Sequence, residues 1–265
     1  MSRVLRVLAS TFALSASLTL VYRANILFYI AIQIARIGGQ FLTVAAGYDF
    51  AGGEISGWTR DQAMLLTAVN ALSEQMFSCF FINSLFNVTP GVWTGKFDFV
   101  LLKPLHPLLS MVAAGRFSVA SMPNLVIAMG PIIYFARSAE HLQDFWTYGL
   151  LVVLVLVGVA VRVAIGLLCM ATMFFSERMA HAEESYWAVN SLTRYQMEIY
   201  PGWLRHIFTY ALPLSAIAYV PVSVLTGSYS GRTVTTSLAV CLLFVFGAAK
   251  VFLSCVRRYK SVNSG

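Results

Sequence analysis

Apolar residues in this 265-residue chain gather in long runs that short polar segments separate. An α-helix needs about 20 mainly apolar residues to cross the hydrocarbon core of a bilayer. Six runs approach or exceed that length: residues 25–46, 62–88, 108–136, 146–175, 207–226 and 233–254. The pattern therefore predicts an all-α integral membrane protein with six transmembrane helices.

The charges between the runs indicate how these helices are oriented. Cytoplasmic loops of membrane proteins are enriched in Lys and Arg. The segments 49–61 and 137–144 are acidic or neutral, so we expect them outside. Basic residues gather before the first run, between the second and third, and after the sixth: Arg3, Arg6, Arg23, Lys96, Lys103, Lys250, Arg257, Arg258 and Lys260. Both termini are therefore expected in the cytoplasm, which requires an even number of spans.

Residues 177–206 allow two interpretations. They carry too many charges to face lipid, yet residues 186–200 have an apolar pattern compatible with a helix. The segment is either a cytoplasmic amphipathic helix before a fifth span at 207–226, or it is itself the fifth span and lines a polar cavity. In the second case 207–226 is a re-entrant outer segment broken at Pro213 and Pro221, which is tolerated only beside protein or water. Both interpretations keep the number of spans even.

The chain begins with a basic and moderately apolar segment. Such a segment also resembles the basic and apolar regions of a secretory signal. We favour an interfacial helix over residues 1–24, because serines and threonines dilute the apolar run and Tyr22 and Arg23 lead directly into the first span. The whole chain is then one domain, with a six-span bundle at 25–254 and a cytoplasmic tail at 255–265.

Composition supports the membrane assignment. Hydrophobic residues make up 58% and charged residues 11% of the chain, and mean hydropathy is +0.75, whereas soluble domains carry about a quarter charged residues. The net charge of +7 follows from topology, and without a basic stripe interleaved with aromatics no nucleic-acid partner is expected. The four cysteines lie in or beside apolar runs without a C-x-x-C spacing, which argues against a disulfide framework or a thiolate metal site.

Motifs for chemistry on this chain are missing. The four histidines are scattered and none lies in an H-E-x-x-H sequence, so no metal site is expected. Residues 91–96 (GVWTGK) are one residue short of a phosphate-binding loop, and Phe97 stands where Ser or Thr would bind magnesium. Residues 227–231 (GSYSG) have Tyr229 in place of a nucleophilic serine. We therefore predict no catalytic residues and no nucleotide or other cofactor bound by this chain.

Several charged residues fall inside the apolar runs. Burying Arg36 or Glu74 alone near the middle of its span costs at least about 3 kcal/mol. The two lie at comparable depth, so either they form an interhelical ion pair or each faces a polar cavity or a partner subunit. Arg116 and Arg162 lie nearer the inner ends, and we interpret them as anchors whose long side chains reach the headgroups.

Polar residues between 183 and 200 are candidates for a substrate pathway. Asn190, Thr193, Arg194 and Glu198 would be costly against lipid but useful along a polar route. A cytoplasmic helix would carry the same residues without that cost.

The loop between the second and third runs contains a specific string. Residues 94–107 read TGKFDFVLLKPLHP, which resembles the G-x-x-D-x-x-L-L-x-P-L signature of permease subunits of type-two ATP-binding-cassette (ABC) exporters, in the branch of small six-span bacterial proteins. Tyr22 and Arg23, the segment 200–221 and the basic tail 257–261 are also similar to features of those permeases. One departure is Leu212-Pro213, where the broader class has Asn-Pro.

The resemblance implies that a separate ATPase supplies the force through a short cytoplasmic coupling helix at residues 94–109. Asp98 lies near the positive end of that helix dipole, and apolar side chains, Phe97 among them, form the docking surface. Pro104 and Pro107 end the helix and direct the chain back to the membrane. The implied coupling residues are Gly95, Phe97, Asp98, Leu101, Leu102 and Pro104.

The implied function is that of one half of an exporter that moves an unassigned substrate out across the bacterial inner membrane. Two ATPase subunits, which hold ATP and magnesium, and a second permease, identical or similar, would complete it within membrane lipid. Two alternatives are a membrane scaffold that holds a cytoplasmic partner, and an ion-coupled secondary transporter in which Glu74 titrates at mid-membrane.

Overall fold

The computed structural model describes residues 9–17, 23–86, 95, 97–102, 106–136, 145–174, 182–227 and 230–258. Within these ranges the regular elements are helical, apart from a short antiparallel hairpin of β1 (Glu54–Ile55) and β2 (Trp58–Thr59). The main helices are α2 (Arg23–Phe50), α3 (Arg60–Phe80), α4 (Ile82–Phe86), α6 (Phe97–Leu101), α7 (Pro107–Gly115), α8 (Met122–Ala136), α9 (Phe145–Thr172), α10 (Ala182–Ser191), α11 (Gly202–His206), α12 (Tyr219–Leu225) and α13 (Gly231–Arg258).

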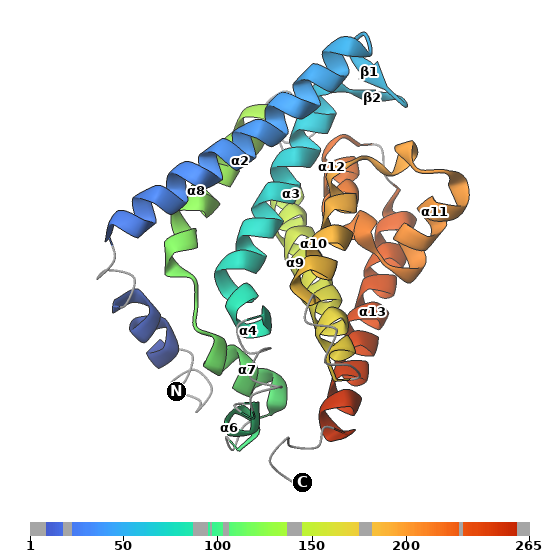
Figure 1. Cartoon of the computed structure of the whole chain (residues 1–265). Helices are drawn as coiled ribbons and strands as arrows, with labels where there is room; N and C mark the ends of the chain where they lie inside the picture. The colour runs from blue at the N-terminus through green and yellow to red at the C-terminus, as the bar shows by residue number, and fades with distance from the viewer. Residues whose placement is uncertain are drawn as a thin grey trace.

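The helices form a bundle with two distinct ends (Figure 1). At one end lie α6, the last turn of α13 and the short helix at 9–17; we name it the α6 end. The β1–β2 hairpin lies at the opposite end, the hairpin end. Helix α2 crosses the bundle obliquely up to the hairpin, and α3 runs back from it through the centre (Figure 1).

Helix α3 begins at a capping box. The Gln62 backbone N–H donates to Thr59 Oγ1 at 3.4 Å, and the Thr59 N–H donates to Gln62 Oε1 at 3.0 Å. From there α3 packs against α2, α8, α9 and α12, so most of its residues are buried. Helix α3 therefore lies at the centre of the bundle.

The third predicted span, 108–136, is not one helix. It is divided into α7 and α8 at Arg116, which has a φ of +57°. The backbone N–H groups released by the break find partners: Phe117 donates to Ser15 Oγ at 3.1 Å, and Ser118 donates to the Cys79 carbonyl at 2.9 Å. The run at 108–136 therefore consists of two helices, and long-range partners satisfy the backbone at the bend between them.

Residues 182–200 run along α3 in the opposite direction. Near the α6 end, the Tyr186 ring stacks on the Phe77 ring, with 4.8 Å between the two ring centroids. At the hairpin end, Gln196 Nε2 donates to the Tyr48 hydroxyl at 3.0 Å and the Ile55 carbonyl at 3.4 Å. The segment therefore extends along the buried face of α3 and does not lie across the end of the bundle.

Residues 202–226 enter the bundle and turn back. They comprise α11, a π-helical turn η4 (Ile207–Ala211), a bend at Pro213, η5 (Leu214–Ala216) and α12. Ile217 lies very close to Gly158 in the middle of α9. A Cβ added to Gly158 would be 3.0 Å from the Ile217 Cα. Glu198 before this segment and Thr226 at its end line the same cavity beside the hairpin. Both ends of the segment thus lie at the hairpin end, as in a re-entrant loop.

Three helices within the described ranges are long and apolar enough to cross a membrane: Ile26–Phe50, Thr147–Thr172 and Gly231–Arg258. Met122–Phe135 is a shorter apolar helix. Six spans are therefore not confirmed: α3 carries many polar residues, and the segments at 108–136 and 182–226 are interrupted.

Candidate functional site

Arg36 of α2 and Glu74 of α3 form an ion pair, with Arg36 Nη1 2.5 Å from Glu74 Oε1. Arg36 Nε also donates to Gln33 Oε1 at 2.7 Å. The Glu74 side chain is 1% exposed and that of Arg36 is 32% exposed. The carboxylate is thus enclosed in protein, whereas the guanidinium lies at the edge of the bundle.

Arg162 of α9 points into the bundle and is 0% exposed. Its Nε donates to Ser73 Oγ at 3.1 Å. Its Nη2 donates to two oxygens of Asn70, the side-chain Oδ1 at 2.7 Å and the backbone carbonyl at 3.3 Å. The interpretation of Arg162 as an anchor that reaches the headgroups was therefore wrong. Its side chain extends toward α3, where uncharged oxygen atoms accept its hydrogen bonds.

Thr193 connects the same cluster to the segment at 182–200. Its hydroxyl lies 2.9 Å from Asn70 Oδ1 and 2.7 Å from the backbone carbonyl of Asn190. The side chains of Asn70 and Asn190 are both buried. We name Asn70, Ser73, Glu74, Arg162 and Thr193 the polar layer.

The polar layer lies where two apolar clusters meet. Toward the hairpin end, Val69 and Val155 belong to one cluster. Toward the α6 end, Phe77 and Ile165 belong to the other. On α3 the layer falls between Val69 and Phe77, and on α9 Arg162 falls between Val155 and Ile165. Buried polar groups need hydrogen-bond partners, so this layer favours one arrangement of α3, α9 and residues 190–193.

A polar cavity of about 540 Å³ opens at the hairpin end. Glu198 lies inside it, accepting a hydrogen bond from the Tyr219 hydroxyl at 2.5 Å and pairing with Arg205 at 3.4 Å. The Trp58 and Tyr219 rings are 5.5 Å apart. The remaining lining is mostly hydroxyl and amide side chains: Ser56, Gln62, Ser223, Thr226, Ser230 and Thr233.

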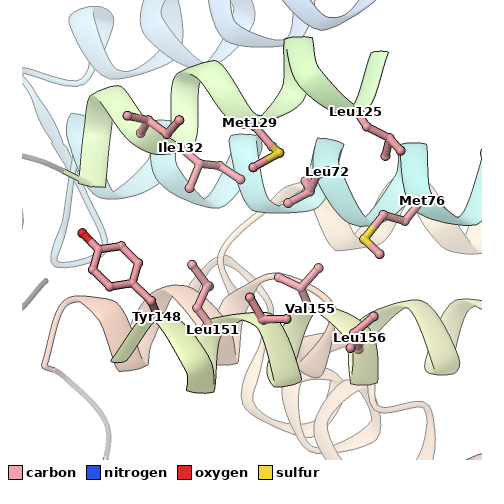
Figure 2. A pocket seen from close by; sticks show the side chains of 11 residues that line it. Leu72, Met76, Leu125, Met129, Ile132, Tyr148, Leu151, Val155 and Leu156 are labelled. Atoms are coloured by element: carbon pink, nitrogen blue, oxygen red, sulfur yellow. The ribbon is translucent and has the colours of Figure 1, made fainter. Parts of the chain in front are cut away.

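An apolar groove of about 590 Å³ separates α9 from α3 and α8. Figure 2 shows Leu72 and Met76 of α3 with Met129 of α8 on one side, facing Leu151 and Val155 of α9 on the other. Tyr148 lies at one end of the groove (Figure 2).

Helix α6 presents two faces. Phe97 is fully buried and meets Phe174 edge-on at 5.9 Å, so it anchors the helix to the bundle. Phe99 and Leu102 are 71% and 76% exposed. The docking surface predicted from Phe97 and its neighbours is thus divided: Phe97 faces inward, and the exposed apolar side chains are Phe99, which the sequence pattern did not single out, and Leu102.

The other predicted coupling residues are placed as follows. Gly95 has a φ of +71°, a conformation that favours glycine, and Asp98 lies in the first turn of α6. Pro107 does not end a helix but occupies the first turn of α7. Pro104 lies outside the described residues, as does Tyr22 of the predicted anchor, and Arg23 is the first residue of α2.

Sequence reasoning missed the partners of Arg162. Asn70 and Ser73 are three residues apart and therefore lie on one face of α3, which is the signal that was available. Within the described part of the chain, no group of three or more His, Cys, Asp or Glu side chains could hold a metal ion.

A comparison with known families matches residues 34–263 to an ABC-2 family transporter protein. The chain belongs to the ABC-2 transporter family. It is a multi-pass membrane permease of an ABC transporter, a class whose ATPase resides in a partner. No curated protein matches the chain.

Proposed function

We propose that this permease is one half of an exporter, and that α6 is the coupling helix through which two ATPase subunits drive it. The observation that carries the proposal is the division of α6 into a buried side, held by Phe97, and an exposed apolar side formed by Phe99 and Leu102. Exposed apolar side chains on a polar end of a membrane protein are suited to a protein partner. ATP and magnesium would be bound by that partner.

The same arrangement supports an orientation for the chain. Arg257 and Arg258 lie at the α6 end of α13, and Asp49 and Glu54 lie at the hairpin end. The excess of basic residues at cytoplasmic boundaries favours the α6 end as the cytoplasmic one. Both termini would then face the cytoplasm of a bacterial cell, with the permease in the inner membrane.

We further propose that 182–200 is the fifth span and 202–226 a re-entrant outer segment. Asn190 and Thr193 are then buried positioning residues, whereas Glu198 and the partly buried Arg194 remain candidates for the substrate pathway. Glu198 lines the polar cavity, where a substrate would leave. A second permease, identical or similar, would complete the pathway.

The test is co-purification of the full chain, expressed in its native host and solubilised in detergent. We expect wild type to retain an ABC ATPase, identified by mass spectrometry, and Phe99→Asp/Leu102→Asp to lose it. Trp203→Asp, an exposed aromatic at the hairpin end, is the matched control and retains it. Size-exclusion profiles show that each variant is folded.

Retention of the ATPase by a folded Phe99→Asp/Leu102→Asp variant would refute α6 as the coupling element. ATP-dependent substrate movement in vesicles separates an exporter from a scaffold and from an ion-coupled transporter, because neither alternative needs ATP.

A further inference from the structure

The apolar groove beside α9 reaches the central helix α3. Helices α8 and α9 each pack on α3, and the groove of about 590 Å³ lies between them. From Ala63 to Cys79 the residues of α3 are buried, apart from Leu72 and Met76. These two are four residues apart on one face of the helix, and both line the groove. The groove therefore exposes a part of α3 that is otherwise enclosed.

The groove opens onto the outer surface of the bundle. Its walls include Met129 of α8 and Val152 and Leu156 of α9, each of which is about half exposed. Helix α9 is one of the helices that can cross a membrane. The side chains that line the groove are apolar apart from the Tyr148 hydroxyl. Apolar cavities exclude water, so a lipid or a protein segment is expected to fill this one.

The two ends of the groove differ in polarity. Tyr148 lies at one end, and Met76 and Leu156 lie at the other (Figure 2). The Tyr148 end is the one nearer the hairpin, because Leu151 packs against the cluster that contains Trp58. Tyrosine is enriched where hydrocarbon meets lipid headgroups, since its ring is apolar and its hydroxyl is polar. An amphiphile would thus lie with its polar group beside Tyr148 and its apolar part along the groove.

The length of the groove distinguishes between two kinds of occupant. Tyr148 and Leu156 are eight residues apart on α9, which is a rise of about 12 Å. One leaflet contributes about 15 Å to a hydrocarbon core of about 30 Å, and a helix that crosses the membrane needs the whole thickness. The lining also exposes far less surface than the about 800 Å² that a stable protein interface buries on each partner. The groove therefore fits a lipid chain better than a helix of a second permease.

We propose that an acyl chain of a membrane phospholipid occupies this groove, with the headgroup beside Tyr148 and the chain against Leu72 and Met76. The lipid belongs to the leaflet on the side of the hairpin end. Met76 and Met129 suit such a ligand, because flexible methionine side chains adapt to the shape of an apolar partner. The bound chain fills the space between α8 and α9 and completes the packing around α3.

The test is photolabelling of the full chain in phosphatidylcholine vesicles. A trace of phosphatidylcholine carries a diazirine at the end of one acyl chain, and mass spectrometry locates the adducts. Adducts on Leu72 or Met76 report the groove, because the neighbouring residues of α3 are buried. Adducts on Val126, which is exposed on α8 outside the groove, report general lipid contact. We expect wild type to give both. A diazirine in the headgroup should label Tyr148 and not α3.

Two neighbouring valines of α9 provide a variant and its matched control. Val152, 59% exposed, lines the groove, whereas Val153, 50% exposed, does not. Val152→Trp fills the groove and should lower the ratio of α3 adducts to Val126 adducts several-fold. Val153→Trp adds the same ring on the same helix and should leave that ratio unchanged. If Val152→Trp does not fold, Leu156→Trp, on the same wall, takes its place.

Absence of α3 adducts in wild type would overturn the proposal. A disulfide-linked dimer of a Val152→Cys variant would then identify a helix of a second permease as the occupant. An unchanged ratio in the folded groove variant, or an equal loss in Val153→Trp, would also overturn it. The measurement uses the permease alone, so its outcome is independent of the proposed ATPase coupling and of export.

Discussion

Arg36 and Glu74 join α2 to α3 through an ion pair whose two ends differ in burial: the carboxylate is enclosed and the guanidinium reaches the edge of the bundle. The pair is therefore asymmetric. Removing either partner leaves the other in a different environment, and the structure indicates which loss is the more damaging.

We expect Arg36→Met to destabilise the protein by about 3–5 kcal/mol, because it leaves Glu74 buried without its partner. Glu74→Gln should cost less, roughly 1–3 kcal/mol. In that variant Arg36 still donates a hydrogen bond to Gln33, and its side chain is partly exposed to solvent. Denaturant unfolding of the detergent-solubilised chain measures both. The exchange Arg36→Glu with Glu74→Arg should assemble better than either single charge reversal; a double variant no better than the single ones would contradict a functional pair.

A second prediction concerns Gly115 at the end of α7. A Cβ there would lie 2.1 Å from the Ser84 Cα of α4, so the two backbones meet at this point. Gly115→Ala should destabilise the protein by about 1–3 kcal/mol, because the added methyl group overpacks this contact. Gly130→Ala in α8, where a Cβ meets nothing within 4 Å, is the control and should change thermal stability little. Equal effects of the two substitutions would count against the close approach of α4 and α7.

The buried side of α6 gives a third prediction. Phe97→Ala removes a fully buried ring and should cost about 3–5 kcal/mol. Phe99→Ala, on the exposed side, should leave thermal stability of the isolated permease within about 0.5 kcal/mol. If Phe99→Ala destabilises the isolated chain as much as Phe97→Ala, the two faces have been assigned wrongly.

The re-entrant segment predicts a labelling pattern. Single cysteines in place of Trp203 and Ser230, both exposed, should react with an impermeant maleimide from the same side of sealed cells. A cysteine at Phe99 should react only after the membrane is opened. The four native cysteines are replaced by serine or alanine beforehand. Labelling of Trp203→Cys and Ser230→Cys from opposite sides would mean that 202–226 crosses the membrane.

How far the sequence predicts this molecule depends on the range of the interactions involved. The helical class and the apolar lengths of α9 and α13 follow from local composition. The pairing of Arg36 with Glu74 was one of two interpretations, since depth can be counted along each helix. These features need only the pattern within one or two segments.

The remaining features depend on partners far away in the chain. The break at Arg116 relies on Ser15 and Cys79, and the direction of the Arg162 side chain relies on Asn70 and Ser73. Hydrophobic periodicity contains no information about such contacts. The same holds for residues 182–200, whose polar side chains suit either a solvated helix or a buried one.

The asymmetry of the Arg36–Glu74 pair also bears on how the protein is made. Helix α3 is too polar to partition into lipid alone, since the insertion machinery selects segments by their apolar character. Helix α2 precedes it in the chain and already carries the charge that Glu74 needs. During biosynthesis, then, α2 and α3 are expected to leave the translocon together as a helical hairpin, with the acidic side chain neutralised before it meets the hydrocarbon.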